Sequence, residues 1–146
     1  TIEDVFGYVM DEKGKKKLAD DIFRDEKLRK TLNAIVHPRV FHHIEQLKVK
    51  AKDETIIIID MPLLFEVGYD QCVDLVVLIY VDRETQTTRL SQRNNITREE
   101  AIIKIDSQMS MEDKRKLADV IIDNTQSIDD LYQQCQKFLE EIRYEK

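Results

Sequence analysis

Apolar residues recur every three or four positions through the first third of the chain. Residues 15–23 and 26–36 each carry such a stripe, which predicts two amphipathic helices. His37 and Pro38 interrupt the pattern, because proline disfavours helical geometry at the residue before it and suits the first position of a new helix. We therefore expect a third helix from Pro38 to about Lys52.

Three short aliphatic runs predict strands: Thr55–Asp60 with four consecutive isoleucines, Asp74–Val81 (DLVVLIYV) and Ala118–Asp123 (ADVIID). None of them alternates apolar with polar residues, which indicates burial on both faces, as in central strands of a parallel sheet. A polar helix over 82–93 and a helix from the capping box at Thr97 separate these strands.

A last amphipathic helix is expected after Ser127. Strands that alternate with helices predict an α/β fold with a parallel sheet. Three strands make a thin sheet when all of them look central. We therefore expect that part of the sheet is missing from this chain.

Composition narrows the classes of protein. A chain of 146 residues with 42% hydrophobic residues suits a single domain with one core, and the net charge of −6 argues against a nonspecific nucleic-acid binder. The longest apolar runs are too short to cross a membrane. Two widely spaced cysteines predict reduced thiols in a cytoplasmic protein, and the three histidines lack partners at the spacing of a metal site.

The run DMPLLFE (60–66) follows the isoleucine strand. Ligands of open parallel sheets bind beyond the carboxyl ends of the strands, which makes this run a candidate site. There Asp60 would hold a hydroxyl or a Mg²⁺-bound water, and Glu66 would accept from a ligand. Between them an apolar wall would be formed by Leu63, Leu64 and Phe65. The alternative is that Asp60 caps a turn and the leucines are ordinary core.

Two polar segments offer a second and a third candidate. Residues 83–104 carry five basic and three acidic side chains, and Arg89 and Arg93 share a helix face on which planar guanidinium groups would suit phosphate oxygens. A solvated face paired with nearby carboxylates explains the same pattern. Asn124, after the last strand, either faces a purine edge or belongs to a plain turn.

These segments, in this order, resemble one family, the dephospho-coenzyme A kinases of the P-loop kinase class. The matching runs are LNAIVHP (32–38), MPLLFE (61–66), the strand that ends at Asp82, the arginines near 89–93, and ADVIIDN (118–124). NAIVHP and MPLLFE, at their mutual distance, are specific to that family. The resemblance covers nearly the whole chain.

The resemblance implies transfer of the γ-phosphate of ATP, with Mg²⁺, to the ribose 3′-hydroxyl of dephospho-coenzyme A. It also implies one P-loop kinase-like domain over 1–146, with a helical coenzyme A-binding region (1–54), a core (55–82 and 118–146) and a lid region (83–117). The implied site residues are His37 and Pro38 for coenzyme A, Leu63, Leu64 and Glu66 for the acceptor, Arg89 and Arg93 for phosphate charge, Gln108 in support of the lid, and Asn124 near adenine.

The chain also departs from the family. A P-loop needs G-x-x-x-x-G-K-[ST], and the only glycines, Gly7, Gly14 and Gly68, form no such motif. Lys104 stands where many members have Arg. We therefore expect an incomplete P-loop kinase fold without its N-terminal strands, inactive by itself. The rival hypotheses are another P-loop kinase acting on a nucleoside, nucleotide or sugar, and a non-catalytic α/β binding module.

Overall fold

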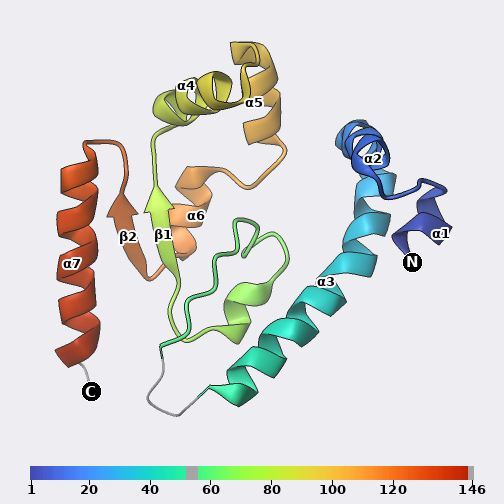
Figure 1. The fold of residues 1–146 in the computed structure, drawn as a ribbon. Helices are drawn as coiled ribbons and strands as arrows, with labels where there is room; N and C mark the ends of the chain where they lie inside the picture. Colours follow the sequence, from blue (N-terminus) through green and yellow to red (C-terminus); the bar gives the residue numbers. More distant parts are fainter. Residues whose placement is uncertain (52–55, 145–146) are drawn as a thin grey trace. The chain divides into compact units, whose positions relative to one another are not determined.

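A computed structural model describes the backbone of residues 1–51 and 56–144, and all of their side chains except those of 23, 24, 143 and 144. The chain divides into two compact units, Thr1–Asp60 and Met61–Lys146. The first unit is helical, and the second contains a parallel sheet with helices (Figure 1).

The first unit contains helices α1 (Ile2–Phe6), α2 (Glu12–Arg24) and α3 (Glu26–Lys50). Asp25 separates α2 from α3, since its carboxylate accepts hydrogen bonds from the N–H groups at the start of α3. Among the described side chains of this unit, the buried apolar one is that of Leu18 in α2, which is 4% exposed. Helical structure is confirmed over both predicted stretches, the second as the first part of the longer α3.

The predicted break at His37 and Pro38 is wrong. Helix α3 runs through Pro38 without interruption as far as Lys50, and Lys52 lies outside the described residues. Proline removes one N–H donor and crowds the preceding turn, which disfavours a helix interior. Here the 25-residue helix continues on both sides of that position.

The second unit has a 3₁₀ turn, two strands and four helices among its described residues. In chain order these are η1 (Tyr69–Cys72), β1 (Val77–Tyr80), α4 (Arg83–Asn94), α5 (Arg98–Asp106), α6 (Met111–Leu117), β2 (Val120–Asp123) and α7 (Ile128–Tyr144). Helix α7 packs along β2, and α6 packs along β1 (Figure 1). The buried apolar side chains of the second unit are Tyr69, Val76, Leu78, Ala101, Ile105 and Ile122.

Strands β1 and β2 pair in parallel, with Val77 opposite Val120 and Tyr80 opposite Asp123. A parallel pair needs a long crossover connection, which α4, α5 and α6 supply. The predicted capping box at Thr97 is present: its hydroxyl accepts from the Glu100 N–H, and the Glu100 carboxylate accepts from the Thr97 N–H. Two of the three predicted strands and the alternation of helices with them are confirmed.

The prediction of a doubly buried strand over Thr55–Asp60 is wrong for the part that is described, since Thr55 lies outside the described residues. Residues 56–60 have no strand structure. Ile56, Ile57 and Ile58 are 58%, 41% and 85% exposed. The sheet of the described residues consists of β1 and β2 alone, so this run has no neighbouring strand to bond.

Candidate functional site

The carboxyl ends of β1 and β2 meet at one edge of the sheet. The Asn124 N–H donates to the Tyr80 carbonyl at 2.7 Å and so extends the pairing one residue beyond β2. The Gln134 side chain of α7 bonds both the N–H and the carbonyl of Asp123, at 2.8 Å each. Asn124, predicted to lie near a nucleotide, is therefore held at the strand-end edge.

Arg89 of α4 reaches this edge. Its guanidinium donates to the Asn124 carbonyl at 2.7 Å, which joins two predicted site residues that are 35 positions apart. A guanidinium has five N–H donors, so this bond leaves others for a ligand. Arg93, one turn later, donates from Nε to the Asn94 side chain at 3.1 Å on an exposed part of the helix.

Two carboxylates at the same edge are ionised at neutral pH. Hydrogen bonds from Thr85 lower the pKa of Asp82, the N-cap of α4. Hydrogen bonds from Thr125 lower the pKa of Asp123, and the nearby Arg115 adds a smaller effect. Arg115 also lies over the Tyr80 ring, 5.1 Å from its centroid. The edge therefore combines two negatively charged carboxylates with two guanidinium groups, those of Arg89 and Arg115.

The MPLLFE run forms a compact turn over residues 62–68, which we call the 62–68 turn. Backbone bonds from Leu64 to Met61 and from Val67 to Leu63 close it, and Gly68 ends it in the left-handed conformation, with φ of 69°. Leu63 and Leu64 are half-buried. Their exposure lies between that of core residues and that of surface residues. Both interpretations, a wall that contacts a ligand and ordinary core, therefore remain predictions.

Glu66 is held by the segment that follows α5. Its Oε1 accepts from the Met109 N–H at 2.9 Å and pairs with Lys114 Nζ at 2.9 Å. Gln108 precedes Met109 in this connection, and its side chain is exposed. The structure thus brings the residue after Gln108 against Glu66, across 43 positions of sequence.

Lys114 is not among the predicted site residues, because helix α6 was not predicted from the sequence. The signal was present: Ser110 caps α6, its hydroxyl accepting from the Asp113 N–H and donating to the Asp113 carboxylate. A Ser-x-x-Asp spacing is a helix-start pattern of the same kind as that at Thr97.

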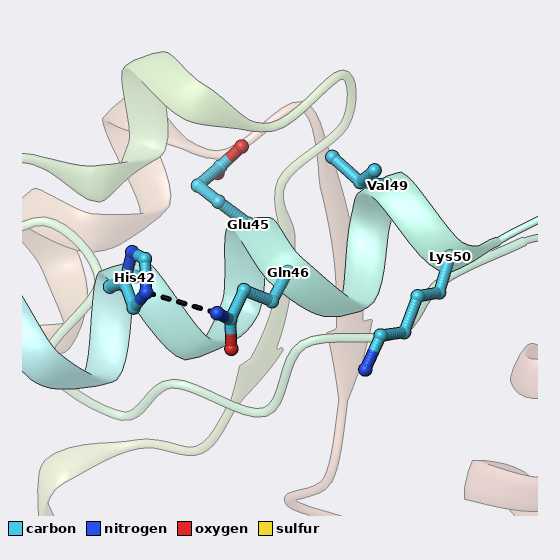
Figure 2. A pocket seen from close by; sticks show the side chains of 5 residues that line it. All are labelled: His42, Glu45, Gln46, Val49 and Lys50. Carbon is cyan, nitrogen blue, oxygen red and sulfur yellow. Dashed lines mark hydrogen bonds between the residues drawn. The ribbon is translucent and has the colours of Figure 1, made fainter.

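His37, Pro38 and Asp60 belong to the first unit. The His37 ring lies against Phe41, with centroids 5.9 Å apart, while Pro38 and Asp60 are exposed. Farther along α3 lies an open depression of about 400 Å³ (Figure 2). It is lined by His42, Glu45, Gln46, Val49 and Lys50 and contains none of the predicted site residues.

Two ion pairs connect α4 to α5 within the predicted lid region. The Arg98 guanidinium makes two parallel hydrogen bonds to the Glu84 carboxylate, and Arg83 pairs with Asp106 at 2.7 Å. These bonds lower the pKa of Glu84 and that of Asp106. All four side chains are more than half exposed, so each pair makes a small contribution to stability.

We expect the Arg98–Glu84 contribution to disappear in acid. A carboxyl group whose folded pKa lies below its ordinary value stabilises the fold above that ordinary value, 4.5 for Glu84, and this stabilisation is lost as the pH falls through the folded pKa. Glu84→Gln should therefore lower the urea midpoint at pH 7 and have no effect at the lowest pH that the fold tolerates. Glu140→Gln, on α7, is the control. A Glu84→Gln effect that persists in acid would contradict the assignment.

Comparisons with known proteins all identify the same family. The family model described as dephospho-CoA kinase matches residues 1–130. The dephospho-CoA kinase of Listeria innocua is 39% identical over 126 residues, which cover 85% of this chain and 63% of that protein. The Arabidopsis thaliana enzyme of the same name is 40% identical over 129 residues, covering 87% and 56%. The chain thus spans between about half and two thirds of the length of these relatives.

Solved structures share the fold. A crystal structure of a Thermus thermophilus protein superposes with a TM-score of 0.72 at 30% identity, covering 87% of this chain and 66% of that one. The dephospho-CoA kinase from Campylobacter jejuni superposes with a TM-score of 0.61 at 35% identity, covering 88% and 64%. The predicted α/β fold class is confirmed. The chain belongs to the dephospho-CoA kinase family.

Proposed function

We propose that this chain supplies the acceptor-binding, lid and adenine-side parts of an enzyme that transfers the γ-phosphate of ATP to the ribose 3′-hydroxyl of dephospho-coenzyme A. The observation that carries the proposal is the family match over residues 1–130. The bond between Arg89 and the Asn124 carbonyl supports it, since a lid arginine then lies at the strand-end edge where a nucleotide would bind.

The proposed roles follow from charge and position. Phosphoryl transfer depends on orientation and on stabilising negative charge at the phosphate, which suits the guanidinium groups of Arg89 and Arg93. The half-buried Leu63 and Leu64 would contact the acceptor, and Gln108 would support the lid. Asn124 would lie near the adenine of ATP, and His37 and Pro38 would contribute to the coenzyme A-binding region.

Mg²⁺ would accompany ATP in this reaction. Kinases hold this ion through one or two carboxylates together with the substrate's phosphate oxygens. In the described parts of the chain, no three His, Cys, Asp or Glu side chains gather into a metal-binding group. These residues do not form a protein cage for the ion. Asp60 is the proposed contact to a Mg²⁺-bound water or a substrate hydroxyl.

The cytoplasm is the proposed location. The two cysteines, Cys72 and Cys135, form no disulfide in the structure, as is usual for proteins of a reducing compartment. In the described residues, no helix has both the length and the apolar character that a membrane crossing requires.

An acceptor panel tests the proposed function. The protein from the complete reading frame is incubated with ATP and with dephospho-coenzyme A or a series of nucleosides and nucleoside monophosphates, and initial rates are compared. We expect dephospho-coenzyme A to be the preferred acceptor, and the 146-residue chain alone to be inactive because it contains no P-loop motif. Preference for a nucleoside monophosphate would overturn the proposal.

A further inference from the structure

We propose that Lys114 is a positioning residue for this reaction, one that holds the 62–68 turn against the connection between α5 and α6. The inference rests on the proposed function for its kinetic consequence, and on the contacts of the second unit for its structural part. Its starting observation is burial: Lys114 is 6% exposed. Lysine is almost never buried to this degree unless its charge is paired.

The contacts of Lys114 are concentrated on the turn. Its Nζ donates to the Pro62 carbonyl at 2.8 Å and pairs with Glu66 Oε1 at 2.9 Å. These two partners lie at opposite ends of the PLLFE run, so one ammonium group fixes both ends. Leu63 and Leu64 lie between them, and their positions are therefore set by this clamp.

Glu66 extends the clamp to the lid region. Its Oε1 forms the ion pair with Lys114 and also accepts a hydrogen bond from the Met109 N–H. The Glu66 side chain is only 21% exposed. Lys114 and the Met109 N–H thus hold the Glu66 carboxylate in a fixed place. Because Met109 follows Gln108, the same clamp links the proposed acceptor wall to the proposed lid support.

Another lysine on the same helix shows what an ordinary surface pair looks like. Lys116 is 72% exposed and pairs with Asp113, three residues earlier on α6. Its ion pair lies within α6 and not with the 62–68 turn, which makes Lys116→Met a matched control for Lys114→Met. Both changes remove one charge from α6 and keep a long unbranched side chain.

Steady-state kinetics of the complete protein test the proposal. A displacement of about 1 Å in a reacting group costs on the order of 100-fold, so Lys114→Met should lower kcat/KM for dephospho-coenzyme A by about 10- to 100-fold. The KM for ATP should stay within about twofold, because the change lies on the acceptor side. Lys114→Arg, which keeps the cation, should recover most of the loss. If Lys114→Met behaves like Lys116→Met, the proposal is wrong.

Two further measurements keep the test decisive. If Lys114→Met does not fold, Glu66→Gln removes the ionic partner while leaving an acceptor for Met109, and it should show the same selective loss. Amide hydrogen exchange reports the clamp without activity: exchange at Val67, Gly68 and Met109 should rise at least about tenfold in Lys114→Met and not in Lys116→Met. Unchanged exchange overturns the clamp. Absence of turnover in the unmodified protein overturns only the proposed function.

Discussion

Arg89→Ala in the complete protein should lower kcat for dephospho-coenzyme A phosphorylation by about 10²- to 10³-fold, the usual cost of removing one preorganised donor from a developing negative charge. The KM for dephospho-coenzyme A should change little, because an interaction that strengthens in the transition state contributes to kcat. Arg89 is suited to this role by its place: it leaves α4 toward the strand-end edge and bonds the Asn124 carbonyl at 2.7 Å. Rapid-quench and steady-state assays with saturating ATP give both constants.

Arg83→Ala is the matched control for Arg89→Ala. Arg83 begins the same helix, but its guanidinium is occupied by Asp106 of α5. Its loss should weaken the α4–α5 contact and leave kcat nearly unchanged. Arg89→Lys should recover only part of the activity, because an ammonium retains the charge and lacks the planar fork. Equal losses in Arg83→Ala and Arg89→Ala would show that the arginines act on lid stability alone.

Ile122→Ala should lower the free energy of unfolding of the 146-residue chain by about 2–5 kcal/mol, the range for truncating a buried aliphatic side chain. Ile122 is 4% exposed, lies in β2 opposite Ile79, and faces the core of the second unit. The cost combines the transfer free energy of the lost methyl and methylene groups with that of the cavity left behind. Urea titration at pH 7 measures it as a shift in midpoint at constant slope.

The neighbouring residue provides the control for that measurement. Ile121 is 39% exposed, and successive side chains of a strand point to opposite faces. Ile121→Ala should therefore cost well below half of the Ile122→Ala value, roughly 1 kcal/mol or less. Equal losses at the two positions would contradict the structure's placement of Ile122 in the core and of Ile121 at the surface.

Local sequence signals predicted the parts of the fold that depend on local chemistry. The helix that begins after Asp82 and the capping box at Thr97 were visible because a cap satisfies backbone donors within three residues. The rule that ligands of parallel sheets bind at strand carboxyl ends directed attention to Asn124, and the structure holds that residue at such an edge beside Arg89.

The isoleucine run shows where the same reasoning fails. Four β-branched residues favour a strand only if a neighbouring strand accepts their backbone bonds, and the described residues provide none. The helix break predicted at Pro38 is wrong for a related reason. The local preference of proline to interrupt a helix was outweighed by the helical structure on both sides of it within α3.

Lys114 could not have been identified from spacing alone. Its partners, Pro62 and Glu66, are about 50 residues away, and only the packing of α6 against the 62–68 turn brings them together. In the sequence it is one of three basic residues in a row, which reads as a solvated face. Burial separates it from Lys116, and burial depends on tertiary structure.

The position of the phosphate on the product tests the central claim most directly. The protein from the complete reading frame is incubated with ATP and dephospho-coenzyme A, and the product is isolated and examined by mass spectrometry and phosphorus–proton NMR. We expect one added phosphoryl group, bonded to the ribose 3′-oxygen, with ADP formed in equal amount. A product phosphorylated elsewhere, or ADP formed without phosphorylation of dephospho-coenzyme A, would contradict it.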